Sequence, residues 1–187
     1  MATLTGKTVA STYTSLLKLE GNTGSTVAGA SGNAVQVKTG DNDATPLYLN
    51  TDRIGIGTAL PSGALEVSSN SGGGTPVIYI ANHVADTEGG HLAFRKTRGT
   101  TIGTAGTQPT SGDHLGSISW YGSDSNSWER AAAITAAADG TWADNDIPSR
   151  ITFHTVDDET AVLDERMRIN NAGNVGIGAS APGDLLH

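Results

Sequence analysis

The sequence predicts an all-β protein with one short α-helix near its N-terminus. Short runs of β-branched, aromatic or alternating apolar residues recur along the chain, and turn residues separate them. Glycine accounts for 25 of the 187 residues, whereas only 36% of residues are hydrophobic and 5% are aromatic. One segment near the start carries apolar residues at helical spacing instead.

The expected helix runs from Val9 to Glu20. Its apolar residues Val9, Tyr13, Leu16 and Leu17 fall at i, i+4, i+7 and i+8, which places them on one face. A helix of about a dozen residues is marginal alone in water, so this face should rest on the protein's own chain or on a partner.

Strands are expected after a Gly/Ser/Thr/Asn-rich stretch that follows the helix. The expected strands are 47–50, 53–57, 64–67, 76–81, 91–97, 116–122, 150–156 and 165–170. Residues 130–138, RAAAITAAA, favour a helix by alanine propensity, but strands flank them and small side chains suit a strand that lies close to another backbone. We expect this segment to be a strand.

A glycine-rich unit occurs twice, as GIGTALP at 55–61 and GIGASAP at 176–182. In each copy glycine alternates with isoleucine, so one face carries no side chain and lets a backbone approach, while Ile56 or Ile177 is buried on the other face. The second copy also fits the dinucleotide pattern G-x-G-x-x-A, but Pro182 leaves no room for the helix that this pattern requires. We interpret the repeat as structural.

The second copy has fewer residues after its proline than the first. The first copy continues into a strand at 64–68, whereas only Leu185, Leu186 and His187 stand at the equivalent place. A chain end usually lies beyond an element rather than inside it. We therefore expect the natural protein to continue past His187 with a further β module or tip.

Composition argues against several classes of function. The net charge of −8 disfavours nucleic acids and anionic membranes as partners. The chain has no cysteine, and no stretch approaches the roughly 20 apolar residues of a membrane span. We expect no nucleic-acid partner and no membrane insertion.

Catalytic and metal-binding patterns are weak. Glycoside hydrolysis needs two carboxylates across a cleft, but those at 157–159 are adjacent, as in a solvated turn, and Asp164 and Glu165 stand where a strand begins. The five histidines show no H-x-x-x-H spacing, and the acidic loops 41–43 and 139–146 lack the spacing of a calcium loop. We expect no enzymatic activity, cofactor or metal.

Four stretches resemble, in order, a module of bacteriophage tail fibres and related fibrous virion proteins. They are GGHLAFRKTRGT, GDHLGSISWYGSD, AAAITAAADGTWADNDIPSRITFHT and ERMRINNAGNVGIG. The opening GKTVASTYTSLLKLEG is similar to N-terminal segments that attach such fibres to the particle. Together the similar parts cover 6–20 and 47–186.

The resemblance implies an intertwined homotrimer with Gly-rich β shaft and knob modules. A trimer also agrees with the composition, because neighbouring chains can pair exposed strand edges and bury apolar faces that one chain leaves open. The residues expected to be packed in the trimer or its core are Ile56, Ile118, Trp120, Ile151, Phe153 and Ile177. The helix face would dock on a tail adaptor near the portal or on a capsid protein.

These inferences divide the chain into four parts. They are an attachment helix and extended arm (1–45), a first repeat (46–75), a β-rich module (76–166) and an incomplete second repeat (167–187). The expected function is that of a structural tail fibre, assembled in the host cytoplasm and located in the virion, which reaches a host receptor through a distal region. The alternatives are a capsid head fibre or decoration protein and, from another class, a polysaccharide-degrading tailspike.

Overall fold

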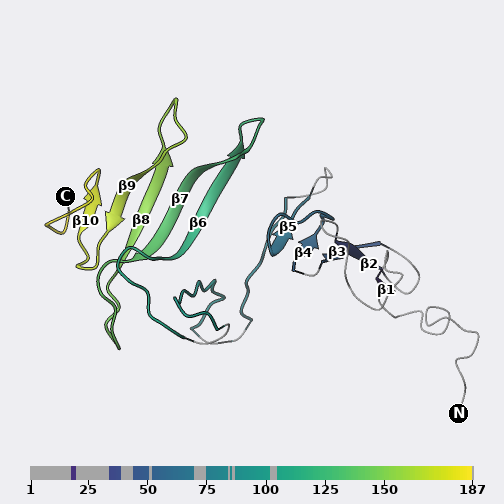
Figure 1. Ribbon diagram of the computed structural model, residues 1–187, viewed down its shortest axis with the longest axis horizontal. Coiled ribbons are helices and arrows are strands. Elements are labelled where there is room, and N and C mark those ends of the chain that lie inside the picture. Colours follow the sequence, from purple (N-terminus) through teal and green to yellow (C-terminus); the bar gives the residue numbers. More distant parts are fainter. Residues whose placement is uncertain are drawn as a thin grey trace, which may run out of the picture. The chain divides into compact units, whose positions relative to one another are not determined.

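The structure is a computed structural model of the 187-residue chain. It describes residues 18–19, 34–38, 44–50, 52–69, 75–83, 85, 87–101 and 105–186. The described residues form ten β-strands and no helix, and the strands make two five-stranded sheets (Figure 1). The all-β class is therefore confirmed. The chain divides into two compact units, Met1–Ala81 and Asn82–His187.

The first unit holds one sheet with the strand order β1-β2-β3-β4-β5. The strands are β1 (Lys18–Leu19), β2 (Val35–Lys38), β3 (Ala44–Leu49), β4 (Ile54–Ile56) and β5 (Leu65–Val67). Neighbouring strands are antiparallel except β4 and β5, which are parallel. The buried side chains of Val35 and Val37 lie on one face of β2.

The expected N-terminal helix lies largely outside the described residues, and so do Val9, Tyr13, Leu16 and Leu17. At its C-terminal end the prediction is wrong, because Lys18 and Leu19 form strand β1 and pair with Lys38 and Val37. A short helix is marginal alone, whereas pairing with β2 satisfies the backbone groups of these two residues.

The second unit holds an antiparallel meander with the strand order β10-β9-β8-β7-β6 (Figure 1). Its strands are β6 (His114–Ser123), β7 (Trp128–Ala138), β8 (Ser149–Val156), β9 (Leu163–Ile169) and β10 (Val175–Ile177). Strand β7 confirms the extended interpretation of RAAAITAAA, in which tertiary pairing overrides the helical propensity of alanine. Strand β9 runs across the expected boundary between residues 166 and 167, and the four-part division remains a prediction.

Two expected strands are not part of either sheet. Residues 76–81 and 91–97 form no ladder with the described chain. Ile78 and Tyr79 are 68% and 86% exposed. An apolar run can predict an extended backbone, but it cannot supply the neighbouring strand that a ladder requires.

The two glycine-rich copies have the same local structure. Two hydrogen bonds of the first copy have direct counterparts in the second. Ile54 N–H to Ala64 O (2.8 Å) corresponds to Val175 N–H to Leu185 O (2.9 Å), and Gly57 N–H to Pro46 O (2.7 Å) corresponds to Gly178 N–H to Arg166 O (2.8 Å). The structural repeat includes the preceding strand, β3 or β9, paired antiparallel to β4 or β10. The loop between the two strands is one residue longer in the second copy. When the two copies are aligned in sequence, a single constant offset therefore matches the glycine-rich parts but not the preceding strands.

The glycines of each copy have separate roles. A Cβ on Gly55 or Gly176 would collide with the carbonyl oxygen three residues later, so the backbone that comes close belongs to the chain's own turn. Gly57 and Gly178 have φ angles of 81° and 70°, in the left-handed region that favours glycine. The isoleucine between them is exposed in both copies, and its expected burial remains a prediction.

The interior of the described chain consists of small and polar residues. In the second sheet the buried residues are Ala133, Thr135, Ala137, Ala138 and Thr152. No large side chain among the described residues is fully buried. The large apolar side chains must therefore be sought on the surface.

Candidate functional site

A row of large apolar side chains crosses all five strands of the second sheet. The strand register sets Ile118 opposite Ile134, Ile134 opposite Phe153, Phe153 opposite Met167 and Met167 opposite Ile177. Side chains of directly opposed residues point to the same face of a sheet and touch across the strands. The row is therefore continuous from one sheet edge to the other.

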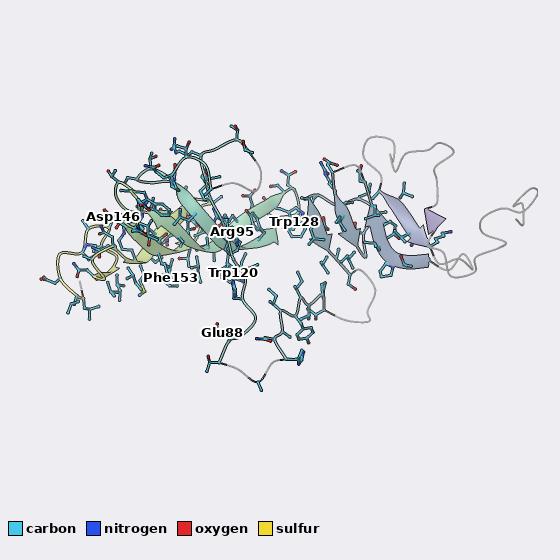
Figure 2. All side chains as sticks on the ribbon, turned by 90° about the horizontal axis from the view of Figure 1, so that it is seen from below. Glu88, Arg95, Trp120, Trp128, Asp146 and Phe153 are labelled. Carbon is cyan, nitrogen blue, oxygen red and sulfur yellow. The ribbon has the colours of Figure 1, made fainter. Side chains whose placement is uncertain are left out.

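A second row runs beside the first on the same face. It consists of Gly116, Ala136, Ile151, Ile169 and Val175, each opposite the next. These residues stand two positions from the members of the first row, so the two rows share a face. Trp120 extends this face beyond Ile118 on β6 (Figure 2). We call the two rows together with Trp120 the apolar sheet face.

The chain itself covers the apolar sheet face only in part, and four of its large side chains are exposed. Ile118, Trp120, Ile151 and Ile177 are 48%, 50%, 43% and 65% exposed. Soluble monomers rarely expose a continuous apolar patch of this kind, and such patches mark interaction sites. The structure thus brings five of the six residues predicted for trimer packing onto one face. The sixth, Ile56, lies in the other unit.

Sequence reasoning missed half of this face. Ile134 is the only large apolar residue in an alanine run, and Met167, Ile169 and Val175 belong to the expected second repeat (167–187) rather than to the expected β module. Their membership depends on register, which the sequence does not show directly.

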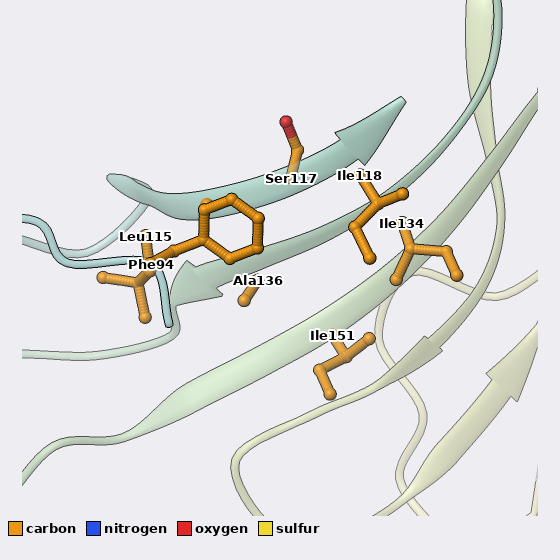
Figure 3. A pocket seen from close by; sticks show the side chains of 8 residues that line it. Phe94, Leu115, Ser117, Ile118, Ile134, Ala136 and Ile151 are labelled. Carbon is orange, nitrogen blue, oxygen red and sulfur yellow. The ribbon is translucent and has the colours of Figure 1, made fainter. Parts of the chain in front are cut away.

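Phe94 lies against one end of the apolar sheet face. A groove of about 330 Å³ is lined by its ring together with Leu115, Ile118, Ile134 and Ile151 (Figure 3). A Cβ on Gly116 would stand 2.6 Å from Cβ and Cγ of Phe94, so glycine is needed for this contact. The segment 91–97 is therefore held over the start of β6 by packing rather than by a ladder.

The opposite face of the same sheet is polar. Its central row is Ser117, Thr135, Thr152, Arg168 and Gly176. Figure 3 shows Ser117 on the other side of β6 from Ile118. The Arg168 guanidinium donates two hydrogen bonds to Glu165, at 2.6 and 2.7 Å, and both side chains are mostly buried.

His154 shares the polar face. Its Nε2 lies 2.8 Å from Thr152 Oγ1, and its Nδ1 is buried without a partner among the described residues. Burial lowers the pKa of His154, and the neighbouring Glu165 carboxylate partly offsets this effect.

The candidate catalytic carboxylates are held in ion pairs or turns. Asp157 and Asp164 both pair with Arg166, at 2.6 and 3.4 Å. Glu165 pairs with Arg168, and Glu159 sits in a turn with a positive φ of 59°. The carboxylates of Asp157, Asp164 and Glu165 are thus engaged by arginine side chains of strand β9.

Metal and membrane sites were also sought in the described part of the chain. There, no group of three or more histidine, aspartate or glutamate side chains is arranged to hold a metal ion. Nor do the described residues include a helix with the length and apolar character needed to cross a bilayer.

Comparison with solved structures identifies the fold. The chain resembles the carboxy-terminal domain of the bacteriophage T5 L-shaped tail fibre, with a TM-score of 0.58 and 14% identity over 90% of this chain and 74% of that one. It also resembles the same domain solved with its intramolecular chaperone domain, with a TM-score of 0.60 and 16% identity. This second similarity covers 90% of this chain and about half (51%) of the longer chain that includes the chaperone domain. No protein-family model matches the sequence, and no curated protein matches it. The chain has a phage tail-fibre fold.

Proposed function

We propose that this chain is a structural fibre protein of a bacteriophage virion and that it works as a homotrimer whose subunits meet through the apolar sheet face. The observation that carries the proposal is the pair of apolar rows, which cross five strands and stand open in a single chain. The tail-fibre fold supports the same assignment.

The energetics favour burial by copies of the same chain. Burying one large apolar side chain fully stabilises by about 1.5–3 kcal/mol, so the open half of such a residue contributes roughly 1 kcal/mol. Four such residues per chain, Ile118, Trp120, Ile151 and Ile177, give about 12 kcal/mol for three chains. A trimer requires two docking events, which together cost about 8–30 kcal/mol. The apolar contribution exceeds the lower end of this range, and pairing of edge strands between neighbouring chains would add to it.

The proposed place of the chain is the tail. In this proposal the N-terminal residues Val9, Tyr13, Leu16 and Leu17 dock on a tail adaptor near the portal, and a distal region contacts the host receptor. A fibre on the capsid would use the same residues on a capsid protein. Immunogold labelling of purified particles distinguishes the two: label at the tail supports the proposal, and label over the shell contradicts it.

Oligomeric state provides the direct test of the trimer. Native mass spectrometry should give three times the 19.0 kDa mass of one chain at micromolar concentration. A single-chain mass under these conditions would refute the trimer.

Attachment can be tested with a pair of matched variants. Changing Leu16 and Leu17 to Asp should remove the fibre from particles, because an unpaired buried carboxylate costs several kcal/mol. Changing the neighbouring Thr14 and Ser15 to Asp should leave occupancy unchanged. Full occupancy with the leucine variant would contradict a docking role for this face.

Enzymatic cleavage is the competing function. Incubation of the purified chain with host envelope polysaccharide should release no reducing sugar, because the carboxylates of the β8–β9 hairpin are engaged by Arg166 and Arg168. Released sugar would identify a tailspike activity instead.

A further inference from the structure

A β-bulge brings several charged side chains together on the polar face of the second sheet. It lies where the register of β8 and β9 shifts between Phe153 and His154. Residues three apart on a regular strand point to opposite faces, but the extra residue of the bulge places Glu165 and Arg168 on the same face. Glu165 therefore lies opposite His154, and Arg168 lies opposite Thr152.

The neutral imidazole of His154 has a defined tautomer. The hydroxyl of Thr152 donates to Thr135 O at 3.3 Å, so its oxygen accepts from His154 Nε2–H at 2.8 Å. In this tautomer Nδ1 carries a lone pair, and it is buried without a partner among the described residues. A further proton would therefore go to Nδ1 and turn it into a buried donor, which needs an acceptor.

Glu165 is the acceptor that the sheet places opposite His154. Its two carboxylate oxygens accept hydrogen bonds from Arg168 Nε and Nη2 at 2.6 and 2.7 Å. A carboxylate has about four lone-pair sites, so Glu165 can also accept from a protonated His154. The imidazolium would then repel the Arg168 guanidinium and weaken the original ion pair.

Asp139, which follows strand β7, is a second anionic group close to Arg168. The pKa of the Arg168 guanidinium is raised first by its hydrogen bonds to Glu165 and also by the charge of Asp139. One carboxylate oxygen of Asp139 pairs with Arg150 at 2.9 Å, and the other accepts the Asn171 N–H at 3.1 Å. Because Asn171 lies in the turn between β9 and β10, Asp139 connects the charges at the bulge with the second glycine-rich copy.

We propose that these side chains form a proton-operated switch with two states. With His154 neutral, Glu165 binds Arg168. When His154 takes up a proton at Nδ1, it binds Glu165, and Arg168 moves towards Asp139. Arg168 then competes for the oxygens of Asp139, which weakens the hydrogen bond to the Asn171 N–H and loosens the turn before β10. Acid is thus sensed on β8, and its effect reaches the second glycine-rich copy.

The surroundings of His154 set the pH range in which the switch operates. Burial is the largest effect and lowers its pKa. Among the charged groups, Glu165 on β9 raises the pKa, and those that lower it are Arg130 on β7, His114 on β6 and Arg168 on β9. The proton is therefore taken up below the ordinary value of 6.5, and the state with neutral His154 is the one present at neutral pH.

The switch goes beyond the fibre role and does not rest on the proposed trimer. His154, Glu165 and Arg168 lie on the face opposite the apolar sheet face. A chain that stays monomeric can still contain the switch, and a trimer can lack it, so the two proposals can fail separately.

A pH titration followed by NMR on the full 187-residue chain tests the switch without any substitution. Long-range proton–nitrogen spectra should show the Nε2–H tautomer of His154 at pH 7.5 and a titration midpoint below 6.5. The backbone amide signal of Asn171 should move with the same midpoint. An Nδ1–H tautomer, an Asn171 signal that does not follow the His154 titration, or unfolding before His154 titrates would overturn the proposal.

Two variants should hold the switch in opposite states. His154→Gln removes the proton acceptor, so the Asn171 amide signal should stay near its neutral-pH position. Glu165→Gln releases Arg168 at every pH, so this signal should stay near its acid position. His91→Gln removes an exposed histidine of the segment 91–97 and should leave the titration unchanged. An Asn171 titration that persists in His154→Gln, or that disappears in His91→Gln, would contradict the switch.

Discussion

Two adjacent residues of strand β6 allow a direct test of the apolar sheet face. Ile118 points to the apolar face and Ser117 to the polar face, and both are exposed in the single chain (Figure 3). Ile118→Asp and Ser117→Asp therefore add the same charge at nearly the same position. Neither change buries a charge within one chain, so both variants should fold.

The expected difference between the variants arises on assembly. Ile118→Asp loses roughly 1 kcal/mol of apolar burial per chain, since about half of the side chain is open in one chain. A desolvated Asp must also take up a proton at pH 7, which costs about 4 kcal/mol given its ordinary pKa of about 3.9. The total is about 5 kcal/mol per chain, or about 15 kcal/mol for a trimer.

Sedimentation velocity provides the measurement. At micromolar concentration Ile118→Asp should sediment as one chain and Ser117→Asp as three. Trimerisation of Ile118→Asp should recover partly at pH 4, where roughly half of the free carboxyl groups are already protonated and the cost of proton uptake nearly vanishes. A trimeric Ile118→Asp at pH 7, or a monomeric Ser117→Asp, would refute the assignment of the interface to this face.

Three further changes test other parts of the argument. Gly116→Ala should displace Phe94, lower the free energy of unfolding by about 1–3 kcal/mol and speed proteolysis of the segment 91–97. Gly122→Ala serves as the control: a Cβ at Gly122 would meet open space, so this change should leave the melting temperature unaltered. Gly176→Ala should lower the melting temperature, because its Cβ would meet the chain's own turn, and an unchanged melt would contradict that geometry. Burial lowers the pKa of His154 below its ordinary 6.5, so the unfolded chain binds the proton first and stability should fall as the pH drops below about 6.5. His154→Gln should reduce this slope in calorimetry at pH 7.5 and 5.5, and an unaltered slope would assign it to other groups.

Much of the fold could be predicted from local patterns. Period-two alternation at Ile118/Trp120 and Ile151/Phe153 gives both the strands and the side chains that share a face. For RAAAITAAA the sequence alone gives conflicting indications, because alanine favours a helix whereas the flanking strands favour a sheet. Pairing on both sides, with β6 and β8, decides in favour of the strand.

Other features could not be predicted because they depend on contacts far apart in sequence. The apolar rows require five strands to pair in one register, and no local sequence pattern shows which residue of a neighbouring strand lies opposite Ile134. The segment 91–97 has the alternation of a strand, yet it is fixed by the Phe94 ring over Gly116. Arg95 of this segment and Trp142 line the same hollow, although they stand 47 positions apart in the printed sequence.

The two faces of the second sheet contribute to stability in different ways, the polar face within a single chain and the apolar sheet face on assembly. On the polar face, Arg168 and Glu165 pair with each other and lie on the same side as the buried Thr135 and Thr152, so the chain itself covers the middle of this side. The apolar sheet face has no such cover, and the residues that are buried in one chain are too small to release much apolar surface from water. In the second sheet, much of the hydrophobic free energy that the described residues can contribute is therefore realised only when the apolar sheet face is covered. A protein built in this way is expected to gain stability together with its quaternary structure, as the proposed trimer would provide.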